Sequence, residues 1–101
     1  MAKAVEIELQ VYRSMDSAVV LPLLTDHCKQ DRDFTALKNV HTHRWHVSVS
    51  GRDYEILTTG AKWFDTRANV GGGGAIDLAM HLQRLNFKQA IAKLRANIPH
   101  A

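Results

Sequence analysis

The sequence predicts an α+β fold, in which a small antiparallel β-meander has one helix before it and a helical hairpin after it. Apolar and polar residues alternate between turn residues over 45–65. Apolar residues then recur at helical spacing after four consecutive glycines, 71–74. A chain of 101 residues, 46% of them hydrophobic, suits a single domain with a modest core.

The first element expected is a strand at the N-terminus. Residues 4–12 read AVEIELQVY, and every second residue from Val5 to Val11 is apolar. A period of two is typical of a strand that buries one face.

A helix is expected next, over about residues 17–30. Asp16 or Ser17 can cap its first turn, and the apolar residues that follow have helical spacing. Pro22 lies inside this range. Because proline is best tolerated in a first turn, it is expected to mark the start of the helix or a kink.

The polar segment 31–44 shows no clear period. It contains two large apolar residues, Phe34 and Leu37. We expect them to pack a short helical turn or strand onto the core.

Three short strands are expected after this segment. The period is two over residues 45–50, and the sequence GRD at 51–53 signals a turn. A second strand is expected over 54–58 and a third over 61–65, joined by a turn at Thr59 and Gly60. Together they form a meander.

Two helices are expected after the glycines. The first opens at about Ala75, and its apolar pattern ends at Leu85. Asn86 can cap the second, and Pro99 is expected to end it. The residues expected on its buried side are Phe87, Ala90, Ile91 and Leu94.

The composition restricts the classes of protein to which this chain can belong. The net charge is +3 and the pI is near 9.3, which permits a polyanionic partner without requiring one. Cys28 is the single cysteine, so no intramolecular disulfide can form. No apolar run is long enough for a signal core or a membrane span, so we expect a cytoplasmic protein.

The glycine run Gly71, Gly72, Gly73 and Gly74 allows two interpretations. Glycine backbones can approach a ligand closely, and the N-terminus of a helix favours anions, so this segment could cradle a phosphate. Alternatively, the glycines serve only a sharp turn from a strand into a packed helix. No Walker or dinucleotide-binding motif is present.

Basic and aromatic residues alternate along the predicted meander. In a nucleic-acid binder the cations neutralise phosphates and exposed rings stack on unpaired bases. At least one of the two tryptophans is expected in the core instead. The residues concerned are Arg44, Trp45, Arg52, Tyr54, Lys62, Trp63 and Arg67.

Histidines supply a competing hypothesis. His41, His43 and His46, with Cys28 upstream, contain metal-ligating groups, but their spacing matches no common zinc motif. A polar surface that contacts phosphates when its imidazoles are protonated is the alternative. We expect neither a metal nor a cofactor.

The sequence GGGGAIDLAMHLQRLNFKQAIAKL resembles the segment that follows the zinc-finger strands in DnaG-type bacterial primases and their relatives on plasmids and integrative elements. Residues 72–76 match the glycine turn of that family, 87–90 match the start of its second helix, and 62–65 resemble its aromatic third strand. The resemblance covers about residues 45–95 and leaves 1–44 as an N-terminal extension.

The chain departs from that family at its metal ligands. Counting back from the glycine turn places Thr66 and Asn69 where the family has a Cys-x-x-Cys pair. An earlier Cys-x-x-His pair should fall near residues 47–51, where no such ligands occur. The resemblance therefore implies a metal-free, degenerate zinc ribbon.

From the resemblance and the alternating cations and rings, we expect a module that binds single-stranded nucleic acid, most naturally DNA, and positions it for a separate primase, polymerase or helicase. The resemblance implies that the polymerising site lies in another domain, so the module is not an enzyme. A protein-interaction adaptor or inhibitor is the alternative. The expected binding residues are Arg44, Arg52, Lys62, Trp63 and Arg67, together with the backbone of Gly71–Gly74.

Overall fold

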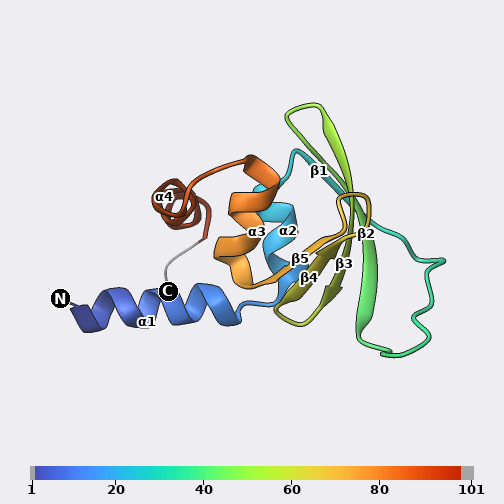
Figure 1. Cartoon of the computed structure of the whole chain (residues 1–101), viewed down its shortest axis with the longest axis horizontal. Coiled ribbons are helices and arrows are strands. Elements are labelled where there is room, and N and C mark those ends of the chain that lie inside the picture. The colour runs from blue at the N-terminus through green and yellow to red at the C-terminus, as the bar shows by residue number, and fades with distance from the viewer. Residues whose placement is uncertain (1, 99–101) are drawn as a thin grey trace.

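A computed structural model describes residues 2–98 and shows the predicted α+β class (Figure 1). Its elements, in chain order, are α1 (Ala2–Ser14), α2 (Ser17–Leu24), β1 (His27–Gln30), β2 (Thr42–Val49), β3 (Arg52–Thr59), β4 (Lys62–Asp65), β5 (Val70–Gly73), α3 (Gly74–Gln83) and α4 (Phe87–Asn97).

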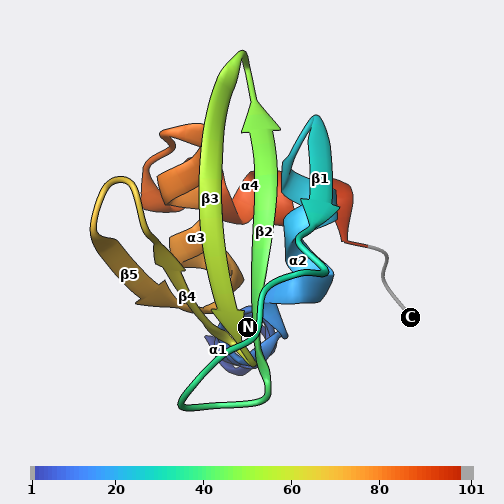
Figure 2. The same cartoon turned by 90° about the vertical axis from the view of Figure 1, so that its right-hand side faces the viewer.

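The strands form one antiparallel sheet in the order β1-β2-β3-β4-β5, so every strand pairs with its neighbour in sequence. The predicted meander is its central part. Ser50 and Gly51 both have positive φ, and they make the tight turn between β2 and β3. All the helices lie on one side of the sheet, and its other face, here called the outer face, is left uncovered (Figures 1 and 2).

The core lies between the inner face of the sheet and the helices. Alternate residues of the strands point into it because side chains alternate across a strand. The buried strand residues include Val47, Val49, Ile56 and Trp63. They pack with buried helix residues that include Val20, Leu21, Leu24, Leu78, Leu82, Ile91 and Leu94.

The N-terminal prediction is wrong, because residues 4–12 belong to helix α1. Tyr12 is buried and Leu9 packs against the core, whereas Ile7 and Val11 are 61% and 51% exposed. Residues four apart share one face of a helix, so Ile7 and Val11 point outward together. A strand prediction assumes that every alternate apolar residue is buried, but α1 leaves Ile7 and Val11 exposed. The alternation in sequence is therefore compatible with a helix.

Helix α2 has the predicted start, but it ends earlier than predicted. The Asp16 side chain caps it by accepting the Ala18 N–H at 2.9 Å. The helix stops at Leu24, and the expected range to residue 30 is wrong because 27–30 form β1, which pairs with 45–48 of β2. Pairing with β2 therefore makes the second half of the predicted helix a strand.

Segment 31–41 is a loop rather than an element packed on the core. The side chain of Leu37 is fully exposed, which corrects its expected burial. Phe34 is partly buried, and the Arg44 guanidinium lies 4.9 Å from the centre of its ring. The loop is thus attached to the sheet through Phe34 and crosses its lower end (Figure 2).

The glycines form strand β5 and the start of α3. Gly72 pairs with Trp63, and a Cβ on Gly72 would lie 2.6 Å from Cζ2 of the indole. Gly74 has φ +86°, and a Cβ there would lie 2.7 Å from the Cα of Arg13. A side chain at Gly72 would keep β5 away from the Trp63 indole, and one at Gly74 would keep α1 away from the start of α3.

The C-terminal hairpin is largely as predicted. The Asn86 side chain caps α4 by accepting the Gln89 N–H at 2.8 Å, and the Gln89 Oε1 in turn accepts the Asn86 N–H at 3.0 Å. Phe87 is 47% exposed, which corrects its expected place on the buried side of α4. Pro99 lies outside the described residues.

These glycine contacts predict that replacing glycine by serine has different effects on stability at the neighbouring positions 72 and 73. Gly72→Ser should displace the Trp63 indole and destabilise the protein by about 1–3 kcal/mol. Gly73→Ser should leave stability unchanged or slightly higher, because its Cβ meets nothing within 4 Å and serine favours the N-cap of a helix. Urea unfolding of both variants checks this, and equal losses would contradict it.

Candidate nucleic-acid interface

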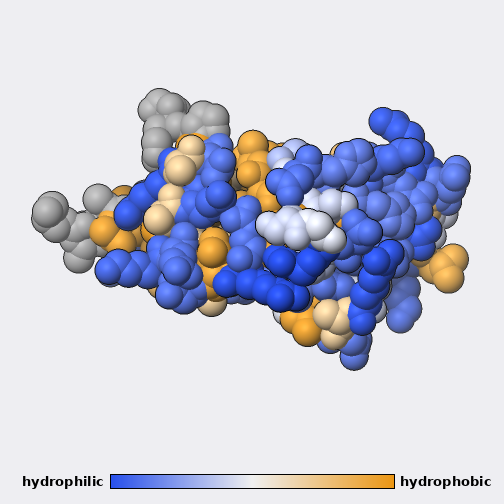
Figure 3. Space-filling view, turned by 90° about the horizontal axis from the view of Figure 1, so that it is seen from above, coloured by the Kyte–Doolittle hydropathy of each residue, from blue (hydrophilic) through white to orange (hydrophobic). Residues whose placement is uncertain are grey.

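The centre of the outer face is built from alternate residues of three strands, β2, β3 and β4. The pairing register and burial place Thr42, Arg44, His46, Asp53, Glu55, Leu57, Thr59, Lys62 and Phe64 on it. Seen from above, hydrophilic residues cover most of the sheet half of the molecule (Figure 3). Among the residues placed on the outer face only Leu57 and Phe64 are apolar, and Phe64, 37% exposed, is the larger.

Two adjoining hollows lie where the outer face meets loop 31–41. The first, of about 450 Å³, is lined by Asn39, Thr42, Leu57, Thr59, Lys62, Trp63, Phe64 and Gly72. The second, of about 390 Å³, is lined by residues 34–39 and Thr42. Because they share Asn39 and Thr42, we treat them as one groove, called the outer groove. Its floor combines the apolar Leu57 and Phe64 with the hydrogen-bonded hydroxyls of Thr42 and Thr59, 2.7 Å apart.

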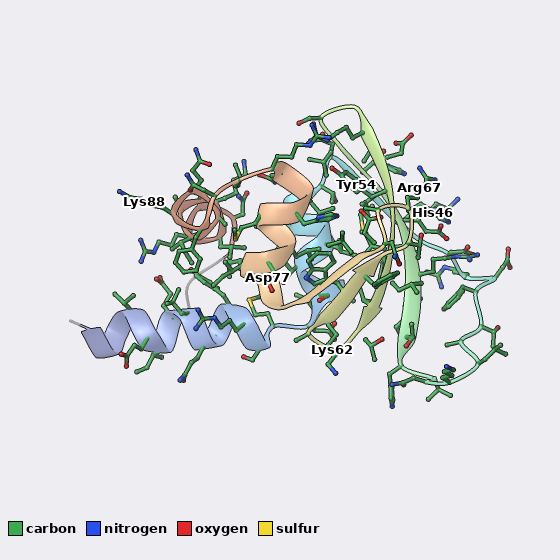
Figure 4. The ribbon with its side chains drawn as sticks, in the orientation of Figure 1. His46, Tyr54, Lys62, Arg67, Asp77 and Lys88 are labelled. Atoms are coloured by element: carbon green, nitrogen blue, oxygen red, sulfur yellow. The ribbon has the colours of Figure 1, made fainter. Side chains whose placement is uncertain are left out.

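Two lysines border the outer groove. Lys62 lines the first hollow and Lys38 the second. Neither has an ion-pair partner among residues 2–98. Figure 4 shows Lys62 at the lower end of the sheet, with Arg67 and His46 beside the outer face and Lys88 on the opposite side of the molecule. The groove is thus bordered by positive charge that is not neutralised internally.

Arg44, also on the outer face, is held by acidic partners. Its guanidinium lies 2.6 Å from Asp31 and 3.2 Å from Glu55, and it covers the Phe34 ring. The hydrogen bond from Arg44 lowers the pKa of the Asp31 carboxyl below its ordinary value. This charge is therefore neutralised, and the side chain anchors the base of loop 31–41.

Arg52 and Arg67 have different environments. Arg52 donates to the Tyr54 hydroxyl at 3.1 Å and to the Leu82 carbonyl at 3.3 Å, so it fastens the C-terminus of α3 to the sheet. Arg67 is exposed, and its guanidinium makes a long hydrogen bond, 3.5 Å, to the Asp53 carbonyl. Of these two expected binding residues, Arg67 is the accessible one.

Trp63 lies on the inner face and is 5% exposed, so it cannot serve as a stacking platform. Its ring centroid is 4.9 Å from that of His81, and its Nε1 has no hydrogen-bond partner among the described residues. The exposed ring is its neighbour Phe64. Alternation in β4 could have indicated that the two rings face opposite ways, but the sequence alone does not show which face the helices cover.

The start of α3 offers little room for a phosphate. The Gly73 N–H donates to the Asp77 carboxylate at 3.3 Å, and the Gly74 N–H donates to the Ala61 carbonyl at 2.8 Å. A phosphate placed here would face the negative charge of Asp77 and find these donors already engaged. The architectural interpretation of Gly71–Gly74 therefore has the better support.

The histidines do not assemble with other ligands. Within residues 2–98, no three His, Cys, Asp or Glu side chains come together as a metal-binding group. His43 lies 3.4 Å from the Gln30 amide, and His46 lies 3.4 Å from Asp31. Burial raises the pKa of the Cys28 thiol, which disfavours the thiolate that would bind a metal. His41 is exposed.

A buried carboxylate holds the turn between β4 and β5. One oxygen of Asp65 accepts the N–H groups of Arg67 and Ala68, each at 3.0 Å, and the other lies 2.7 Å from Nε2 of His81. No pattern in the sequence indicated this contact between Asp65 and His81. Thr66, in the same turn, bonds to Glu55 at 2.9 Å. We call the Asp65 and His81 contacts the turn clamp.

No protein-family model, curated protein or solved structure matches this chain. Among the helices of residues 2–98, none combines the length and the apolar character needed to cross a membrane.

The turn clamp predicts a large effect on stability. Asp65→Ala should destabilise the protein by about 3 kcal/mol, because it removes a buried charge-assisted contact and leaves two turn N–H groups without their acceptor. Asp77→Ala is the matched control, since Asp77 is exposed and makes one long hydrogen bond. Urea unfolding should show little change for the control, and similar losses in both variants would refute the clamp.

The Arg44 contact predicts the acid behaviour of the loop. The Asp31 pKa is lowered in the folded protein, so the stabilisation is present above the ordinary carboxyl pKa of about 3.9 and is lost as the pH falls through the lower folded pKa. Arg44→Gln should shift the Asp31 titration upward and speed amide exchange in loop 31–41. Carboxyl NMR titration and hydrogen exchange measure both effects. An unshifted Asp31 midpoint in this variant would show that Arg44 is not the cause.

Proposed function

We propose that this chain binds single-stranded DNA along the outer groove, as a non-enzymatic, cytoplasmic accessory module of a mobile-element replication or primase system. One observation carries the proposal: the exposed Phe64 ring lies on an uncovered sheet face in a groove bordered by Lys62 and Lys38, neither of which has an ion-pair partner among residues 2–98.

The chemistry of the groove suits an unpaired strand. Lysine ammonium groups neutralise phosphates, and an exposed ring stacks on a base whatever its identity. Leu57 extends the apolar floor beside Phe64, while Asn39 and the threonine hydroxyls offer polar contacts at its edges. Bases in a duplex are already stacked and paired, so the ring favours single strands.

The resemblance to primase zinc ribbons supports the same proposal. That family places strands, a glycine segment and two helices in the order found over residues 45–95. We propose that the turn clamp of Asp65 and His81 stabilises the turn that a zinc ion holds in such ribbons. A separate primase, polymerase or helicase would then act on the strand held by this module.

A protein-interaction adaptor or inhibitor is the second candidate, and helix α1 favours it. Ile7 and Val11 form an exposed apolar pair on the side of α1 that faces away from the core. Helix α1 also lies far from the outer face (Figure 1). The two surfaces can therefore be tested separately.

Titration of a fluorescent single-stranded oligonucleotide at two salt concentrations tests the proposal. Phe64→Ala should weaken binding by roughly 5- to 100-fold, the loss of one base stack. Lys62→Ala should weaken binding and reduce the slope of log affinity against log salt by about 0.7.

The matched controls are Phe87→Ala and Lys88→Ala on α4. Phe87 is an exposed phenylalanine, and Lys88 lies on the opposite side of the molecule (Figure 4). Both should bind as the wild type does. No binding at low salt, or equal losses in the α4 variants, would refute the outer groove and leave the adaptor as the better proposal.

A further inference from the structure

A second hollow lies on the inner side of the sheet, where helix α2 begins. Its volume, about 480 Å³, is within the range of roughly 300–1,000 Å³ that small-molecule sites have. The first turn of α2 forms its wall, and residues of β1, β2 and β3 form its floor. We call it the inner pocket. The floor residues are Gln30, His43, Trp45 and Thr58.

The wall of the inner pocket is fixed to the sheet through Ser17. The Ser17 N–H donates to the Gly60 carbonyl and its hydroxyl donates to the Ala61 carbonyl, each at 2.8 Å. Ser17 is itself buried. The first turn of α2 therefore keeps a set position over the floor.

Trp45 supplies the inner pocket with a flat ring in a fixed orientation. Its Nε1 donates to the Thr58 hydroxyl oxygen at 2.9 Å, and the residue is only partly buried where it borders the pocket. Bases stack on such an indole, and a ring that is already held loses little freedom when a ligand binds.

The Thr58 hydroxyl has a proton to donate and no acceptor for it. Thr58 is 1% exposed, and its oxygen accepts the Trp45 N–H. A hydroxyl can also donate one hydrogen bond, but Trp45, its partner among residues 2–98, is a donor only. Because a buried donor without an acceptor is unfavourable, a ligand acceptor at this point would be stabilised.

The inner pocket also offers acceptors. One oxygen of the Asp16 carboxylate accepts the Ala18 N–H, and the other has no hydrogen-bond or ion-pair partner among the described residues. The Gln30 Nε2 lies 3.4 Å from Nδ1 of His43, which leaves the Gln30 amide oxygen open. A ligand here therefore meets one buried donor and two open acceptors beside an indole.

We infer that the inner pocket binds a nucleobase that carries an exocyclic amino group. The base stacks on Trp45, a ring nitrogen or carbonyl oxygen accepts the Thr58 proton, and the amino group donates to the Asp16 carboxylate. Adenine, guanine and cytosine have such an amino group, whereas thymine and uracil do not. The inference goes beyond the proposed function and does not rest on it, because the outer groove lies on the other face of the sheet.

An arginine side chain of a protein partner fits this site less well. A guanidinium also stacks on an indole and donates to a carboxylate. It has five donors and no acceptor, so the Thr58 proton would remain without a partner. The buried hydroxyl therefore favours the base.

Cytidine and uridine are matched probes, because a carbonyl oxygen in uridine replaces the amino group of cytidine. Cytidine should bind roughly tenfold more tightly, since only its amino group can donate to Asp16. Adenosine should exceed inosine for the same reason. In an NMR titration the indole N–H signal of Trp45 should move and that of Trp63 should not. Equal affinities in both pairs, or an unmoved Trp45 signal, would overturn the inference.

Asp16→Asn tests the carboxylate without removing the helix cap, because asparagine caps as well as aspartate. The advantage of cytidine over uridine should fall by about tenfold at an unchanged melting temperature. Asp26→Asn is the matched control, since Asp26 also accepts one backbone N–H, from Ser50, and does not line the inner pocket. An unchanged ratio in Asp16→Asn, or equal changes in both variants, would contradict the assignment.

The outer-groove variants separate this inference from the proposed function. Phe64→Ala and Lys62→Ala should bind cytidine as the wild type does, and a loss in either would place the nucleoside in the outer groove and overturn the inner pocket. Cytidine binding by a chain that does not bind the oligonucleotide would support the inner pocket and defeat the proposed function. Tighter binding of methylguanidine than of cytidine would show an arginine pocket instead.

Discussion

The fold depends on the close approach of strand β5 to the Trp63 indole. The indole fills the inner face where β4, β5 and α3 meet, with its ring against His81 and the Gly72 backbone. A side chain at Gly72 would push the strand away from it. Because β5 leads directly into α3 at Gly74, this contact also sets where α3 begins and lets α1 approach it through Arg13.

This arrangement makes the two faces of the sheet different. The inner face is buried in the core, whereas no helix covers the outer face (Figure 2). Charge also differs across the outer face. Arg44 is neutralised by Asp31 and Glu55, whereas Lys62 has no ion-pair partner among the described residues. A polyanion would therefore be attracted to the end of the sheet where β4 and β5 lie beside loop 31–41.

The turn clamp shows how a small domain can hold a tight turn with side-chain hydrogen bonds. Asp65 satisfies two backbone N–H groups and is itself oriented by His81, which packs between Trp63 and Tyr54. The clamp thus connects the turn to α3 and to the core. Such a buried network stabilises one turn geometry because both oxygens of the Asp65 carboxylate have hydrogen-bond partners.

The sequence by itself determined the elements whose signals are local: the β2–β3–β4 meander, the caps at Asp16 and Asn86, and the C-terminal hairpin. It could not determine α1, β1 or β5, because their identity depends on contacts with other parts of the chain, such as the pairing of β1 with β2 and of β5 with β4. Alternation within β4 requires Trp63 and Phe64 to lie on opposite faces. Only the tertiary structure decided which of the two rings faces outward, because the helices that pack on the sheet determine which face is buried.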